Sequence, residues 1–126
     1  MTLGFAGRIR FFLLVEGASF LVASLIHAGW LIPRYEHAKA RIAEGIIAIV
    51  LLIGVGLSWK GADSVRRVGV AAQGFALLGT LIGLFTVAVG VGPRTTPDII
   101  YHIVILLVLV SGLCLAMKDQ RADRSI

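Results

Sequence analysis

Charged residues and cysteine are both scarce in this sequence, and each scarcity excludes a class of protein. Only 15% of the residues are Asp, Glu, Lys or Arg, against about 25% in a typical soluble domain. The single cysteine, Cys114, excludes an intramolecular disulfide, and no CxxCH motif is present for covalent haem. The sequence also lacks a Walker phosphate loop and the nucleophile elbow of hydrolases. These absences argue against a soluble enzyme of those kinds.

Long apolar runs take the place of the missing charges. Hydrophobic residues make up 58% of the chain, and the mean hydropathy is +0.95. The runs are about 20 residues long, which is the length a helix needs to cross the hydrocarbon core of a bilayer. Because backbone groups in lipid must be satisfied within a helix, we predict an all-α, integral membrane four-helix bundle that forms one domain, 1–126. The predicted spans are 9–32, 39–59, 68–91 and 98–117.

The basic residues indicate how the predicted helices are oriented. Eight of the 12 Lys and Arg residues lie at the two termini and in the loop after the second run, and the other two loops hold the remaining four. Positive charge favours the cytoplasmic side, so we predict a protein of the inner (cytoplasmic) membrane with both termini in the cytoplasm. The basic residues flank apolar runs instead of forming a patch, which indicates a lipid bilayer and not nucleic acid as the partner. The first run is too long for a signal peptide, so we expect it to be retained.

The two halves of the sequence are weakly similar to each other. The segment VEGASFL around Glu16 is similar to AQGFALL around Gln73, and a Pro-Arg pair follows both the first and the third run. At nearly the same offset, Glu44 aligns with His102. The pattern predicts two helical hairpins in the same orientation, related by an axis along the membrane normal.

Three ionisable side chains are predicted to lie at one depth near the outer surface. At a helical rise of 1.5 Å per residue, His27 lies roughly 25 Å from Arg10. By the same arithmetic, Glu44 and His102 lie roughly 24 Å from the basic residues that follow their own runs. Ionisable groups inside a membrane are costly and are usually retained for function. We therefore predict that these three side chains converge into one polar site.

Imidazole and carboxylate are ligands of zinc, iron and copper, and helix bundles build such sites from inward-facing side chains. The site could serve redox (oxidoreductase) chemistry or metal handling, and two histidines on different helices could instead hold haem b. Glu36 would line the mouth, and Tyr35 or Tyr101 could donate a hydrogen bond to a ligand. The alternative is that the histidines bond to backbone carbonyls and the glutamate pairs with an arginine. The candidate metal ligands are His27, Glu44, His102 and His37.

A second polar position lies deeper in the predicted bundle. Glu16 falls in the inner half of the first span, on the same helix face as His27, and Gln73 lies at a similar depth on the third span. A hydrogen bond between the two side chains is one reading, since buried polar groups are usually paired. The other is a proton or solute path through Glu16 and Gln73, in a proton-coupled small-solute transporter. A structural or accessory subunit of a membrane complex is a further alternative.

The first half of the chain carries a family resemblance. Its features are the basic start GRIRFF, the glycine in VEG, the proline after the first run, and the acidic residue that opens AEGIIAIVLLIGVGL. In these features the chain resembles the DoxX-like group of small bacterial four-helix membrane proteins. The resemblance implies a four-helix membrane fold and assigns no function to any residue.

The third run contains a GxxxG motif, Gly79 and Gly83, of the kind that lets two helices approach closely. Because such a surface can receive a helix from another chain, we expect a homodimer or association with a larger membrane complex.

Overall fold

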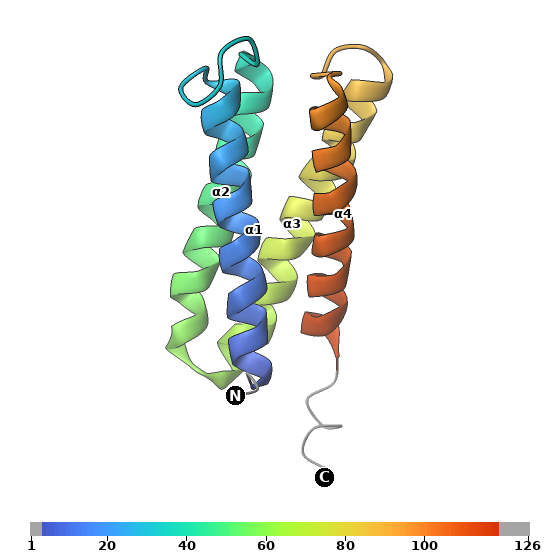
Figure 1. Cartoon of the computed structure of the whole chain (residues 1–126). Helices are drawn as coiled ribbons and strands as arrows, with labels where there is room; N and C mark the ends of the chain where they lie inside the picture. The colour runs from blue at the N-terminus through green and yellow to red at the C-terminus, as the bar shows by residue number, and fades with distance from the viewer. Residues whose placement is uncertain (1–3, 119–126) are drawn as a thin grey trace.

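The computed structural model describes residues 4–118, apart from the side chain of Ala62, and this part of the chain is helical, without a strand. Each of its long helices is long and apolar enough to cross a membrane, as predicted, which indicates a multi-pass membrane protein. Figure 1 shows that the α1–α2 and α3–α4 loops lie at one end of the bundle, called the loop end below. The opposite end is called the terminal end. The elements are α1 (Phe5–His27), α2 (Ala38–Leu57), the short 3-10 helix η1 (Ser58–Lys60), α3 (Ala62–Ala88) and α4 (Thr96–Met117).

The first helix is shorter than its predicted span at the loop end. It stops at His27 because Gly29 adopts a left-handed conformation, with φ of 80°. The Trp30 N–H then bonds the Leu25 carbonyl, and the Gly29 N–H bonds the carbonyl of Ile26. This pair of bonds is the Schellman arrangement that commonly ends a helix at glycine. The helix end therefore leaves His27 in the last turn of α1, close to the loops.

The third helix starts earlier than predicted, at Ala62 instead of residue 68, so its first turns are polar. At the terminal end, the Arg10 guanidinium bonds the Ser58 hydroxyl and carbonyl and lies 3.7 Å from the ring centre of Trp59. This contact joins α1 to η1 and suits a membrane interface. Arg121 and Arg124, which contribute to the predicted orientation, lie outside the described residues.

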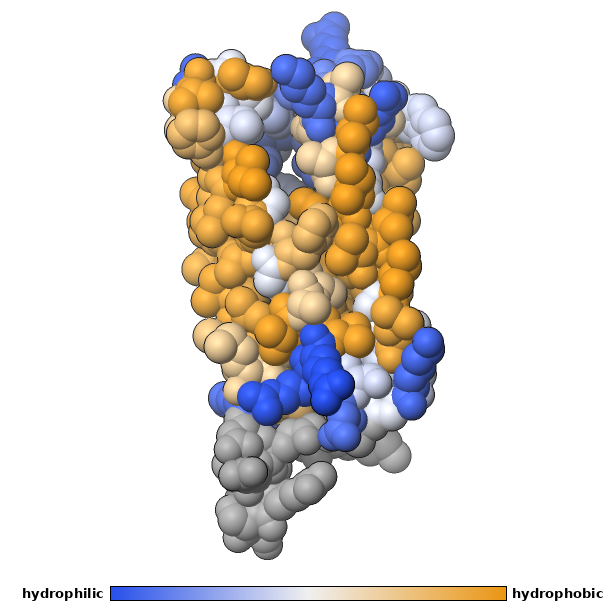
Figure 2. Space-filling view, turned by 180° about the vertical axis from the view of Figure 1, so that it is seen from behind, coloured by the Kyte–Doolittle hydropathy of each residue, from blue (hydrophilic) through white to orange (hydrophobic). Residues whose placement is uncertain are grey.

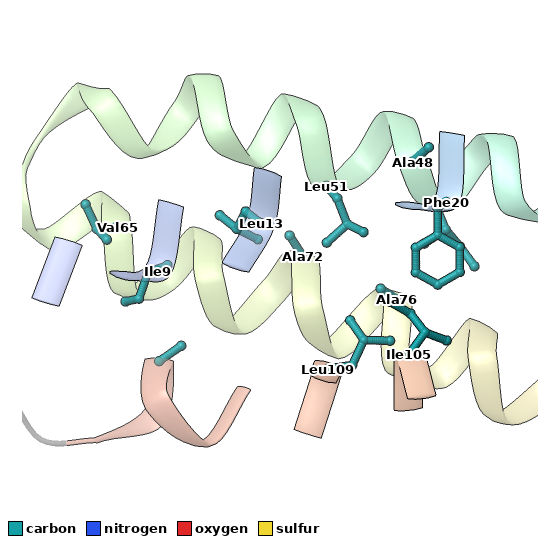
Figure 3. Packing of buried hydrophobic residues seen from close by; sticks show 12 residues of the cluster. Ile9, Leu13, Phe20, Ala48, Leu51, Val65, Ala72, Ala76, Ile105 and Leu109 are labelled. Carbon is teal, nitrogen blue, oxygen red and sulfur yellow. The ribbon is translucent and has the colours of Figure 1, made fainter. Parts of the chain in front are cut away.

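Two helical hairpins, α1–α2 and α3–α4, run in the same direction and pack against each other (Figure 1). Their shared core is apolar, and Leu13, Leu51 and Leu109 from three different helices are fully buried in it (Figure 3). Small residues let the helices approach closely: a Cβ added at Gly69 would lie only 2.8 Å from Ile9. The terminal half of the bundle is therefore held by close apolar packing.

The outer surface of the bundle is a belt of exposed apolar side chains. Phe85 is 66% exposed and Leu107 is 62% exposed, although both are large and hydrophobic. Figure 2 shows the apolar surface between hydrophilic side chains at the two ends. Such a belt is unfavourable in water and suits the hydrocarbon core of a bilayer.

The GxxxG motif packs inside the bundle. A Cβ at Gly79 would lie 2.8 Å from Ile47 of α2, and one at Gly83 would lie 3.3 Å from His102 Nε2 of α4. The motif thus serves contacts within the chain. A homodimer or a larger complex stays a prediction, for which these glycines no longer supply a reason.

Candidate functional site

The most connected polar group of the bundle is a buried cluster of His27, Glu44 and Asp98 at the loop end, called the polar triad below. His27 Nδ1 lies 2.6 Å from Glu44 Oε2, and His27 Nε2 lies 2.9 Å from Asp98 Oδ1. The three residues are only 4%, 5% and 7% exposed. The triad therefore joins α1 to α2 within one hairpin, and α1 to α4 across the two hairpins.

Local sequence explains the placement of two members of the triad, His27 and Asp98. His27 ends α1, where the turn at Gly29 fixes its position. Asp98 lies in the first turn of α4, which Thr95 caps: the Asp98 N–H donates to the Thr95 hydroxyl at 3.3 Å, and this hydroxyl donates to the second oxygen of the Asp98 carboxylate. Negative charge is favourable at a helix N-terminus. The cap thus orients the carboxylate that meets His27 Nε2.

The hydrogen-bond pattern sets the net charge of the triad as long as the outer carboxyl oxygens carry no further proton. Both His27 nitrogens face carboxyl oxygens, so each bond must contain one proton. If the imidazole carries both protons, it is a cation between two carboxylates. If it carries one, the other proton lies on a carboxyl group, and the imidazole is neutral. The triad holds one net negative charge in either arrangement, because the total number of protons is the same.

The structure brings together only part of the predicted site. His27 and Glu44 bond directly, as expected from their equal depth. His102 bonds neither of them: its Nδ1 donates to the Asp98 carbonyl at 2.7 Å, one turn along α4. His37 caps α2, with Nδ1 accepting from the Ala40 N–H and Nε2 donating to the Val91 carbonyl. These two histidines thus follow the alternative of carbonyl bonding.

The sequence did not identify Asp98 as a hydrogen-bond partner of His27. The sequence shows it only as a helix-capping acid after Pro97. Its position four residues before His102 places it on the same face of α4, one turn nearer the loop end. This four-residue spacing could have identified Asp98 as a site residue, because an acid one helical turn from an inward-facing histidine also faces inward.

The other polar residues named from the sequence lie around this centre. The Tyr101 hydroxyl bonds Ser19 at 2.9 Å, which forms a second link between α1 and α4. Glu36 lies over Gly29, where a Cβ would be 2.7 Å from its side chain. In residues 4–118 no group of three or more His, Cys, Asp or Glu side chains is arranged to hold a metal ion. Both nitrogens of His27 are also already bonded, so a metal would have to displace a carboxylate.

A cavity of about 180 Å³ lies between the hairpins on one side of the triad and is called the hairpin cavity. Its wall comes from all four long helices, with Phe20 as the contribution of α1, and from the loop residues that follow α3 and precede α2. Figure 2 shows a hollow at this end of the molecule, below the hydrophilic side chains of the loops. The polar residues that line the cavity are His37, Lys39, Glu44, Thr80, Thr86 and His102.

The hairpin cavity is rich in hydrogen-bond acceptors. The hydroxyls of Thr80 and Thr86 donate to helix carbonyls at 2.8 and 2.7 Å, which leaves their oxygens free to accept. His102 donates through Nδ1, so in the neutral imidazole its Nε2 carries a lone pair, and this atom has no hydrogen bond to another described residue. Glu44 uses Oε2 for His27 and leaves Oε1 without a bond in the described part of the chain. The cavity therefore suits a ligand that donates.

A second, wider groove of about 690 Å³ lies on the other side of the triad, between α1 and α4. His27 and Asp98 form its polar end, and exposed apolar residues such as Val15 and Val22 form its walls. The triad thus separates two openings, with Glu44 facing the hairpin cavity and Asp98 facing the groove.

Comparison with known proteins found no matching family model, no matching curated protein and no matching solved structure. The resemblance to the DoxX-like group stays a prediction.

Proposed function

We propose that this chain is a multi-pass protein of the inner membrane, with both termini in the cytoplasm, that binds a small ammonium-type cation in the hairpin cavity as the first step of proton-coupled transport. The observation that carries this proposal is that Glu44 lines the cavity, has no hydrogen bond at Oε1 to another described residue, and shares the His27 imidazole with a second carboxyl group. With one proton in each of the two bonds, the triad carries one net negative charge. A monovalent cation brings this buried cluster to neutrality.

The chemistry of the cavity supports a donor ligand of limited size. Its free acceptors are a carboxylate oxygen, an imidazole nitrogen and two threonine hydroxyls, and an ammonium group offers several N–H donors to such a set. Lys39 lies at the cavity wall but is exposed, and within residues 4–118 the ion pairs are those of His27 alone. An apolar cavity of about 150 Å³ holds a molecule the size of benzene. The ligand therefore has only a few non-hydrogen atoms.

Calorimetric titration of the protein in nanodiscs tests the proposed binding. Ethylammonium should bind and ethanol, a neutral molecule of similar size, should not. Glu44→Gln should lower the affinity at least about tenfold, since loss of a charge-assisted bond is worth about 1.5–3 kcal/mol. The matched control is Glu36→Gln, which removes an exposed acid from the adjacent loop and should leave the affinity unchanged.

A second variant separates binding from folding. Ala43 lines the hairpin cavity outside the triad, so Ala43→Leu should fill the cavity and abolish binding while the triad stays intact. Equal binding of ethylammonium and ethanol, or ethylammonium binding that survives both Glu44→Gln and Ala43→Leu, contradicts the proposal.

The orientation in the membrane has its own test. With Cys114 replaced by serine, a cysteine introduced at Thr95 should react with an impermeant thiol reagent in intact cells, and one at Ser64 should be protected. The reverse labelling pattern would place the loop end in the cytoplasm and overturn the assigned orientation.

The metal or haem site predicted for His27, Glu44, His102 and His37 stays a prediction, and the bonded state of His27 and His37 does not favour it. Metal analysis and an absorption spectrum of the purified protein decide between this metal or haem site and the proposed cation site. Stoichiometric zinc, iron, copper or haem that is lost in His27→Gln would replace the cation proposal with the metal site.

A further inference from the structure

Glu16 and Gln73 form a second buried polar pair, away from the hairpin cavity and between α1 and α3. Both residues are 0% exposed, and the Gln73 Nε2 amide donates to Glu16 Oε1 at 3.3 Å. The hydrogen bond expected from the sequence is therefore present. The second carboxyl oxygen of Glu16, Oε2, and the amide oxygen of Gln73, Oε1, are also buried, and neither has a hydrogen-bond partner among the described residues.

Helix α4 covers the Glu16–Gln73 pair and contacts it at Gly112. A Cβ added at Gly112 would lie 2.6 Å from Gln73 Nε2 and 2.9 Å from Glu16 Oε1, so a larger residue there would displace the pair. From α2, Leu51 and Leu52 pack against Gly17, the residue next to Glu16. In the described part of the chain no basic side chain forms an ion pair with Glu16. The pair thus lies in apolar surroundings with no counter-charge.

Hydrogen-bond chemistry shows what the pair lacks. An ionised carboxylate only accepts, and the carbonyl oxygen of an amide also only accepts. The two unpartnered oxygens are therefore both acceptors, and neither can satisfy the other. One proton on Glu16 Oε2 changes this, because the new O–H can donate to Gln73 Oε1 after a small side-chain rotation. The acid and the amide then form a closed ring with two hydrogen bonds, and every polar atom of the pair has a partner.

We infer that Glu16 and Gln73 together form a proton-binding site, sealed by Gly112, in which Glu16 holds one proton as a carboxylic acid. Glu16 lies roughly 9 Å from Arg10 and roughly 16 Å from His27 along α1. The pair is thus a second proton-holding group on the helix that carries the triad histidine. Neither side chain lines the hairpin cavity, so the proton site can be tested separately from the proposed binding of a cation in that cavity.

The internal repeat adds a specific expectation. Glu16 and Gln73 are equivalent positions of the two hairpins in the alignment of VEGASFL with AQGFALL, and they meet each other between α1 and α3. Exchanging the two residues therefore turns the acid–amide ring around and keeps both of its hydrogen bonds. The exchanged pair should hold a proton as the native pair does.

Infrared spectroscopy of the protein in nanodiscs at neutral pH tests this inference without any solute. The wild type should show the carbonyl band of a protonated carboxylic acid, shifted in heavy water, that is absent in Glu16→Gln. The double variant Glu16→Gln/Gln73→Glu should restore the band. Glu36→Gln is the control and should leave it unchanged.

Gly112→Ala supplies a second readout if the exchanged variant does not fold. The added methyl group should separate the pair, so the acid band should move to higher frequency as its hydrogen bonds are lost. Identical acid bands in the wild type and Glu16→Gln would show an ionised Glu16 and overturn the inference. An unmoved band in a folded Gly112→Ala protein would equally overturn the acid–amide pairing.

Discussion

The two ends of the bundle are held together by different physical means. In the terminal half, the hairpins meet mainly through apolar side chains and small residues, such as Gly54 against Val68 and Ala72, packed around the buried Glu16–Gln73 hydrogen bond. At the loop end, they meet through hydrogen bonds, from His27 to Asp98 and from Ser19 to Tyr101, with an open volume on each side. The comparison indicates that the terminal half supplies most of the packing and encloses the proposed proton site, whereas the loop end supplies the cavities and the polar side chains that line them.

The two ends should also differ in how strongly they resist separation of the hairpins. Interdigitated side chains resist separation over a whole surface, whereas the loop end depends on a few directional bonds. Removing one member of the triad should therefore affect the loop end strongly and leave the terminal half folded. The variants below test this contrast, from the largest expected effect to the smallest.

Loss of the triad histidine should have the largest effect. His27→Ala leaves Glu44 and Asp98 buried without their shared partner, and breaking a buried charged network by removing one member costs about 3–5 kcal/mol. The free energy of unfolding in mixed micelles measures this loss. An effect below about 1 kcal/mol would show that His27 does not hold the hairpins together.

Glycine substitutions should distinguish close from open positions in the terminal half. Gly112→Ala forces a methyl group into the Glu16–Gln73 pair and should destabilise by about 1–3 kcal/mol, the usual cost of overpacking. A Cβ added at Gly74 would meet no neighbouring helix or side chain within 4 Å in the described part of the chain. Gly74→Ala should therefore be neutral or stabilise by up to about 1 kcal/mol through helix propensity. Equal effects of the two substitutions on unfolding would contradict the packing described for α4.

The caps at the loop end should contribute least. Thr95→Ala removes the cap of α4 and the hydroxyl that bonds Asp98, and His37→Ala removes the cap of α2. Each loss should lower the free energy of unfolding by about 1 kcal/mol. Thr96→Ala, one position along and without a described side-chain bond, is the control for Thr95 and should have no measurable effect.

The sequence predicted the four helices well because hydropathy over some 20 residues is a strong signal. It predicted the meeting of His27 and Glu44 from depth alone. It failed to separate His102 from Asp98, since residues one helical turn apart differ in depth by only about 5 Å, less than the uncertainty from tilt. The end of α1 was also misjudged, because Trp30 to Ile32 continue the apolar run beyond the turn at Gly29. Backbone geometry at one glycine therefore decided where the site lies.

The central claim is that the His27 imidazole is hydrogen-bonded to a carboxyl group at each of its two nitrogens. Nitrogen NMR of isotopically labelled His27 in lipid tests this claim most directly. Both ring nitrogens should show strong hydrogen bonds to carboxyl groups. Glu44→Gln should alter mainly the Nδ1 signal, and Asp98→Asn mainly the Nε2 signal, because each carboxyl group faces one nitrogen. A His27 spectrum that neither substitution changes would show that the imidazole is not held between the two hairpins.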